Sequence, residues 1–300
     1  MGRPRDDARS QSNTQSSVLS PQYLSFMSTQ KSEKELAYLH ELYVATDWGE
    51  RFAELVDEHV KLPEEGRALY VASGTGAHAL ALAQRSPRDL TFVCVDESEE
   101  RLELARAKDS VVKSDKVEFR HAQLEALAFE DEAFDLVVGD ASLVAPERLP
   151  EVLAEMVRVA APGATVSLSV ATASSFGEFF SVYWEALEAA GYDEQAEEVG
   201  TFINELPTVS YVETLAAREA LEGVESWTRI EEFDFDSGRE FLEAPLVRDF
   251  LLERWLGSLP DEEARAAILE EVARIIDEDR HEGDFSLSVK ATIVVGRKTD

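Results

Sequence analysis

The chain has 300 residues, of which 44% are hydrophobic, and its 61 acids and 29 bases give a formal net charge of −32. This length allows one large domain or one domain with a substantial cap. The negative field repels nucleic-acid phosphates and anionic membrane surfaces, so neither is expected as a partner. Solubility is the first explanation of the charge; a basic partner or a cationic substrate is the alternative.

Other bulk features favour a cytoplasmic protein. No apolar run approaches the roughly 18–20 residues of a membrane span, and the N-terminal stretch lacks the apolar segment of a secretory signal. Cys94 is the single cysteine, which excludes an intramolecular disulfide and a cysteine-based metal site. No His, Asp and Glu residues have metal-ligand spacing, so no metal is expected.

The first elements are predicted from composition and capping. Residues 1–33 are rich in Ser and Gln and are predicted to be a disordered tail. The sequence Ser32-Glu33-Lys34-Glu35 is typical of a capping box and begins a helix. Residues 34–66 are predicted to form N-terminal lid helices, the second over about residues 48–60.

From residue 67 to residue 170, apolar runs alternate with helical patterns. The predicted strands are 68–72, 91–96, 116–122, 134–140 and 164–170, and the predicted helices are 77–85, 99–108 and 148–160. Alternation at this spacing indicates right-handed crossovers and a parallel sheet that is covered on both faces.

After Val170 the alternation loosens. Helices are predicted over 176–190, 211–221, 239–256 and 261–279, and strands over 226–235 and 285–298. We therefore expect an α/β fold with a doubly wound, mostly parallel seven-stranded sheet and helices on both faces. The N-terminal lid helices precede it, and a C-terminal helical insertion comes before the last, antiparallel strand. Residues 67–192 would form the cofactor-binding core, and 193–300 the rest of the sheet with an acidic helical cap at about 239–280.

The acids are concentrated in the C-terminal third. Residues 193–282 contain 26 acids and 8 arginines, more than half of the total excess. This segment is therefore the candidate surface for a protein partner.

A turn of small residues joins the first strand of the core to its first helix. Small residues let the backbone approach a ligand closely, and the helix N-terminus offers free N–H groups. Asp96 ends the next strand about 20 residues later, where an acid in doubly wound folds accepts hydrogen bonds from ribose hydroxyls. The strand–loop–helix context therefore predicts a nucleotide-cofactor site at Ala72, Ser73, Gly74, Thr75 and Gly76.

Four motifs in order resemble those of class I S-adenosylmethionine-dependent methyltransferases of the small-molecule type, a group that includes quinone-biosynthesis and biotin-pathway enzymes. ALYVASGTG (68–76) is similar to the family's V-L-D-x-G-x-G-T-G, and Asp96 matches its second-strand acid. AQLEALAFEDEAFDLV (122–137) is similar to G-D-A-E-x-L-P-F-x-D-x-x-F-D-x-V, and EMVRVAAPGA (155–164) to E-x-x-R-V-L-x-P-G-G. The resemblance implies S-adenosyl-L-methionine as cofactor and in-line methyl transfer to a small molecule.

The resemblance also implies site residues. Asp140, in the loop after the fourth strand, would contact the substrate or remove a proton; a capping or solvated acid is the alternative. The implied cofactor-binding residues are Ala72, Ser73, Gly74, Thr75, Gly76, Asp96, Glu97, Gln123, Leu124 and Asp140. Three positions depart from the family pattern: Tyr70 replaces an acid, Ala72 a glycine, and Gln123 the adenine-reading aspartate.

Aromatic residues are candidates for a substrate pocket. Tyr43 and Trp48 precede the core, where relatives place a lid over the cofactor. Phe176, Phe180, Tyr183 and Trp184 follow the fifth strand, at the carboxyl end of the sheet where ligands bind. Core packing is the alternative for residues at this helical spacing. His78, in the first turn after the glycine loop, is interpreted as a surface or helix-face histidine rather than a base.

Two other functions stay open. Tyr70, Ala72 and Gln123 also fit a methyltransferase-like binding or assembly protein without turnover. A nicotinamide dehydrogenase fits poorly, because the loop has two glycines rather than three.

Overall fold

The computed structural model describes residues 31–279 and 284–299, so the predicted tail of residues 1–33 lies almost wholly outside the described residues. The described chain begins with α1 (Glu33–Leu39), a π-helical segment (His40–Trp48) and α2 (Gly49–His59). The capping box of Ser32 and Glu35 starts α1, as predicted. Within the described ranges, no helix is both long and apolar enough to cross a membrane.

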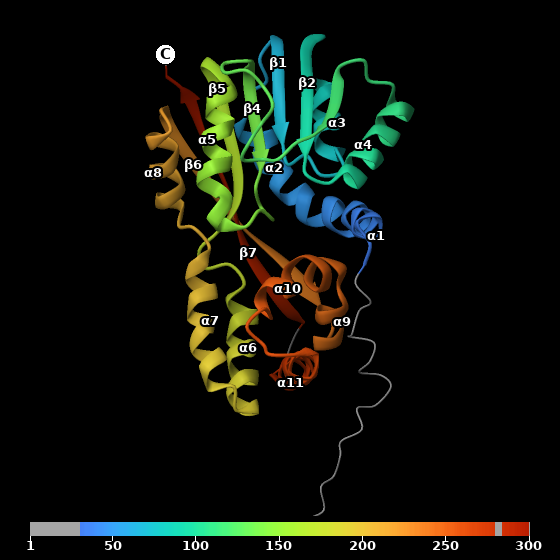
Figure 1. Ribbon diagram of the computed structural model, residues 1–300, viewed down its shortest axis with the longest axis vertical. Helices are drawn as coiled ribbons and strands as arrows, with labels where there is room; N and C mark the ends of the chain where they lie inside the picture. The colour runs from blue at the N-terminus through green and yellow to red at the C-terminus, as the bar shows by residue number, and fades with distance from the viewer. Residues whose placement is uncertain (1–30, 280–283, 300) are drawn as a thin grey trace, which may run out of the picture.

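The strands form one seven-stranded sheet in the order β3-β2-β1-β4-β5-β7-β6 (Figure 1). β7 runs antiparallel to both neighbours, β5 and β6, and the other pairs are parallel. The predicted fold class is therefore confirmed. The strands are β1 (Glu65–Val71), β2 (Asp89–Asp96), β3 (Val117–His121), β4 (Phe134–Asp140), β5 (Ala160–Thr172), β6 (Leu221–Phe235) and β7 (Phe285–Lys298).

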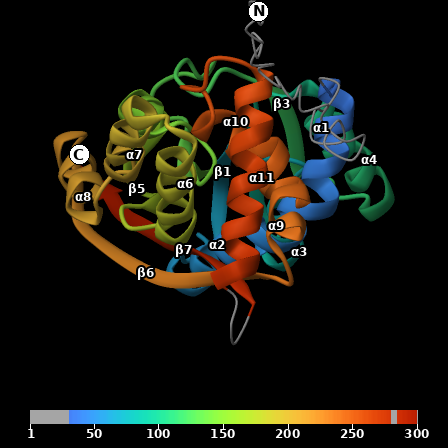
Figure 2. The ribbon, with the colours of Figure 1, turned by 90° about the horizontal axis from the view of Figure 1, so that it is seen from below.

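Helices cover the sheet and extend beyond one end of it. Figure 1 shows α6, α7 and α9–α11 gathered below the central sheet, around the far ends of β6 and β7, and Figure 2 shows the same group from below. The helices after α2 are α3 (Ala77–Arg85), α4 (Glu99–Val112), α5 (Leu149–Val159), α6 (Gly177–Ala190), α7 (Asp193–Glu205), α8 (Val209–Arg218), α9 (Gly238–Glu243), α10 (Leu252–Trp255) and α11 (Glu262–Asp279).

Three regions differ from the predicted elements. β6 begins at Leu221, the last residue of the helix predicted over 211–221, rather than at residue 226. α7 was not predicted, because its sequence is strongly acidic and buries few apolar side chains, Ala196 and Val199 among them. The helix predicted over 239–256 is divided into α9, a π-helical segment (Val247–Leu251) and α10. Pro245 lies at the first break, where its ring and missing N–H interrupt a helix.

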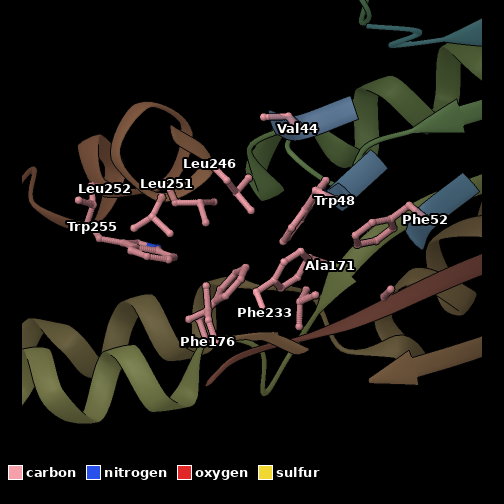
Figure 3. Packing of buried hydrophobic residues seen from close by; sticks show 14 of the residues in the cluster. Val44, Trp48, Phe52, Ala171, Phe176, Phe233, Leu246, Leu251, Leu252 and Trp255 are labelled. Carbon is pink, nitrogen blue, oxygen red and sulfur yellow. The ribbon is translucent and has the colours of Figure 1, made fainter. Parts of the chain in front are cut away.

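An aromatic cluster joins the lid to the cap (Figure 3). The Trp48 ring, at the end of the π-helical segment, stacks on Phe176 and Phe233 with centroids 6.2 Å and 5.7 Å away. Phe176 in turn contacts Trp255 of α10 at 5.2 Å. Buried aromatic pairs contribute about 0.5–1.5 kcal/mol each beyond area burial, so the lid and the cap hold each other over the sheet.

Candidate functional site

A cavity of about 760 Å³ lies at the carboxyl ends of β1, β2 and β4, under the lid and the cap. This volume falls in the range of ligand pockets, and the position is where α/β sheets bind ligands. Eight of the ten predicted cofactor-binding residues line it: Ala72, Ser73, Gly74, Thr75, Asp96, Glu97, Leu124 and Asp140. Gly76 and Gln123 do not line it.

The loop between β1 and α3 has three left-handed residues, with φ of 56° at Ala72, 56° at Gly74 and 77° at Gly76. Only glycine adopts this conformation without a steric cost, so Ala72 is strained. A Cβ at Gly76 would lie 2.8 Å from the Phe119 ring and 2.9 Å from the Ala105 Cβ. Gly76 therefore allows close packing of the loop on the core, which explains why it does not face the cavity.

Asp96 ties the loop to β2. Its Oδ2 accepts a hydrogen bond from the Gly74 amide at 2.8 Å, and its Oδ1 accepts one from the Ser98 amide at 2.9 Å. The Ser73 and Thr75 hydroxyls of the loop are buried and have no hydrogen-bond partner. Buried polar groups are normally paired, so these two hydroxyls are candidates for ligand contacts.

A hydrogen-bonded chain from the lid fixes Asp140. Trp48 Nε1 donates to Ser142 Oγ at 2.9 Å, and the Ser142 amide donates to Asp140 Oδ1 at 3.1 Å. Burial of the carboxyl raises the pKa of Asp140 above its ordinary value. The side chain is thus a positioned carboxylate with a raised proton affinity, as proton acceptors in active sites often are.

A second chain crosses from β1 to the lid. The Tyr70 hydroxyl and His78 Nδ1 are 2.9 Å apart, and His78 Nε2 lies 2.8 Å from Asp57 Oδ1 of α2. Asp57 also pairs with Arg85, and hydrogen bonds from His78 and Arg85 keep the pKa of Asp57 below its ordinary value despite its desolvation. The His78 side chain is only 15% exposed. Its role as a link was missed because its partner Asp57 lies on a different helix.

The six predicted substrate-pocket residues lie in three different environments in the structure. Trp48 lines the cavity. Tyr43 and Trp184 are exposed, at 49% and 46%. Phe176, Phe180 and Tyr183 are buried in the core between β5 and the cap, where they pack with other aromatic residues.

Other lining residues had no sequence signal: His40, Leu143, Val144 and Phe250. The His40 ring lies over Gly74, packs edge-on against Phe250 of the cap, and has an unpartnered, buried Nδ1. Burial lowers its pKa to about 3, so the imidazole is neutral near pH 7. His40 was missed because no local motif marks it; the tertiary fold alone brings it to the loop.

Within the described residues, no group of three or more His, Cys, Asp or Glu side chains could hold a metal ion. The chemistry of the cavity thus depends on the loop, Asp96, Asp140 and the lid. It can hold a nucleotide ligand at the loop and place a second small molecule next to a carboxylate.

Residues 68–163 match a family model described as a methyltransferase domain. The ubiquinone/menaquinone biosynthesis C-methyltransferase UbiE of Geobacter sulfurreducens is 34% identical over 131 residues, which are 42% of this chain and 50% of that protein. A demethylmenaquinone methyltransferase of Shouchella clausii is 31% identical over 124 residues, 40% of this chain and 52% of that protein. The chain spans about half the length of these curated relatives.

Solved structures show the same fold. The YcgJ protein from Bacillus subtilis aligns with a TM-score of 0.56 and 17% identity, over 84% of this chain and 99% of that one. Phosphoethanolamine N-methyltransferase 2 of Haemonchus contortus, solved with phosphomonomethylethanolamine and S-adenosylhomocysteine, aligns with a TM-score of 0.54 and 15% identity, over 93% of this chain and 61% of that one.

Proposed function

Because residues 68–163 match the model of a methyltransferase-domain family, we propose that the chain is an S-adenosylmethionine-dependent methyltransferase that transfers the methyl group directly, in line, to a small molecule. One observation carries the proposal: eight residues that the family motifs mark for the cofactor line one cavity. The residues of this cavity also fit the cofactor chemically. The loop has two unpartnered hydroxyls, on Ser73 and Thr75, and close to it lies the buried carboxylate of Asp96.

Each residue has a task in this proposal. Asp96 accepts hydrogen bonds from the ribose hydroxyls, and Leu124 contacts the adenine ring. The amides at the start of α3 and the Ser73 hydroxyl contact the remaining polar groups of the ligand. When bound, S-adenosylmethionine supplies an already activated methyl group. The protein therefore contributes mainly alignment of the two reactants and exclusion of water.

The lid and the cap exclude water in this proposal. Trp48 and Phe250 both line the cavity, one from the lid and one from the cap. Trp48 is also connected to Asp140 through Ser142. The lid thus positions the carboxylate that removes a proton from the acceptor where the acceptor carries one.

Isothermal titration of the full chain with S-adenosylmethionine and S-adenosylhomocysteine tests the proposal. We expect saturable binding that Gly74→Arg abolishes, because its side chain would collide with His40 and occupy the cavity. Asp96→Ala should weaken it at least tenfold, since it removes a charged acceptor of hydrogen bonds. Gly200→Arg is the matched control, because a side chain there meets open space. Undetectable binding of both ligands at millimolar concentration, or unchanged binding by Gly74→Arg, would contradict the proposal.

A further inference from the structure

The charges around the cavity are not balanced. Eight carboxylates and two arginines line it. Arg148 pairs with Glu97 at 2.7 Å and also with Glu125, and Arg101 lies 3.8 Å from Asp96. Both arginines therefore lie within ion-pair distance of a carboxylate, and each positive charge is offset by a negative one.

Four of the lining carboxylates have no positively charged partner among the described residues. Asp57 pairs with Arg85, and Glu54 pairs with Arg229 at 2.8 Å. No ion pair with another described residue reaches the remaining four lining carboxylates, which belong to Glu33, Glu50, Glu100 and Asp140. His40 adds no positive charge near pH 7, because burial lowers its pKa to about 3. The cavity thus has a surplus of negative charge.

A bound cofactor does not remove this surplus. S-adenosylmethionine carries a sulfonium, an ammonium and a carboxylate, so its net charge offsets only one of the four unpaired carboxylates. A cleft lined by one sign of charge concentrates ligands of the opposite sign and repels those of the same sign. Acceptors that bind as anions are therefore disfavoured.

Two further features indicate what the second ligand looks like. Leu143, Val144 and Phe250 give part of the cavity an apolar wall. His40 Nδ1 is buried in the lining without a partner and can accept a hydrogen bond. Building on the proposed function, we propose that the methyl acceptor is an amine with an apolar body, which binds as its cation beside Asp140.

The proton balance follows from the same geometry. The ammonium passes one N–H proton to the Asp140 carboxylate, and the neighbouring sulfonium favours this transfer because like charges destabilise each other. The freed nitrogen lone pair forms the new N–C bond while the electrons of the C–S bond return to sulfur. The methylated amine leaves as a cation, and the proton on Asp140 then passes to water.

Three probes of similar size and different charge test the proposal. Phenethylamine, 2-phenylethanol and 3-phenylpropionate are titrated calorimetrically into the full chain saturated with S-adenosylhomocysteine at pH 7. We expect the amine to bind at least tenfold more tightly than the carboxylate, with the alcohol between them. Equal or tighter binding of the carboxylate, or no binding of the amine at 10 mM, would overturn the proposal.

Charge variants locate the effect. Glu50→Gln should weaken binding of the amine about threefold and leave the affinity for the alcohol unchanged, as expected for the loss of one exposed charge. Glu185→Gln, an exposed change on α6 away from the cavity, is the matched control. Asp140→Asn should weaken binding of the amine more than Glu50→Gln does. An amine affinity that none of the cavity variants changes would also refute the proposal.

Failure of the acceptor proposal can be distinguished from failure of the proposed function. If S-adenosylhomocysteine binds but the probes show no preference for the amine, the acceptor class is wrong and the proposed function stands. If S-adenosylhomocysteine does not bind, the proposed function fails, and the acceptor proposal that rests on it fails with it.

Discussion

Ala72 occupies a backbone conformation that suits glycine, at a position where the family pattern has glycine. Its φ is 56°, in the left-handed region. This region costs a residue with a Cβ about 1–2 kcal/mol. Glycine removes that cost but raises the entropy of the unfolded chain, which offsets about 0.4–1 kcal/mol. We therefore expect Ala72→Gly to stabilise the protein by about 0.5–1 kcal/mol, the difference between these two terms.

Urea unfolding at pH 7 measures the effect as a higher midpoint with an unchanged m-value. The control is the same substitution at Ala107, an exposed position inside α4. There the residue is helical, and glycine should destabilise by about 1 kcal/mol. The two substitutions should thus change the free energy of unfolding in opposite directions. If Ala72→Gly destabilises the protein as much as Ala107→Gly does, backbone strain at the loop is refuted.

Four further variants probe the loop and its neighbours. Gly76→Ala should cost about 2–4 kcal/mol in urea unfolding, from left-handed strain and overpacking; a cost below that of an exposed helix substitution would contradict the packing. Tyr70→Phe should cost about 1–2 kcal/mol, because it leaves His78 Nδ1 without its hydrogen-bond partner, and a variant as stable as wild type would show that this hydrogen bond contributes nothing. The pKa of Asp57 is lowered in the fold, so the stability that its charged form contributes is present above the ordinary carboxyl pKa near 4 and is lost as the pH falls below that value. The difference in free energy of unfolding between wild type and Asp57→Asn should therefore shrink in acid. A difference that stays constant with pH would refute this. The pKa of Asp140 is raised in the fold, so ionisation of this carboxyl lowers the stability of the protein as the pH rises. Asp140→Asn should therefore be more stable than wild type at pH 7 and lose this advantage near pH 4.

The sequence by itself determined the architecture. Helix 77–85 and strands 134–140 and 285–298 have the predicted bounds, since their periodicity depends on local backbone geometry and on which face is buried. The antiparallel last strand and the helical insertion before it also follow the prediction. The glycine loop and Asp96 were predicted as neighbours because successive parallel strands end at the same edge of a sheet.

Only the tertiary structure decided the rest of the site. His40 and Phe250 are 210 positions apart in the numbering, yet their rings meet at 6.0 Å over the loop. Sequence patterns report the spacing within one element and carry no information on which helix of the cap reaches the lid. For the same reason, the pattern could not separate Trp48, which lines the cavity, from Tyr183, which is buried in the core. Their helical spacing is alike, and only packing against other elements distinguishes them.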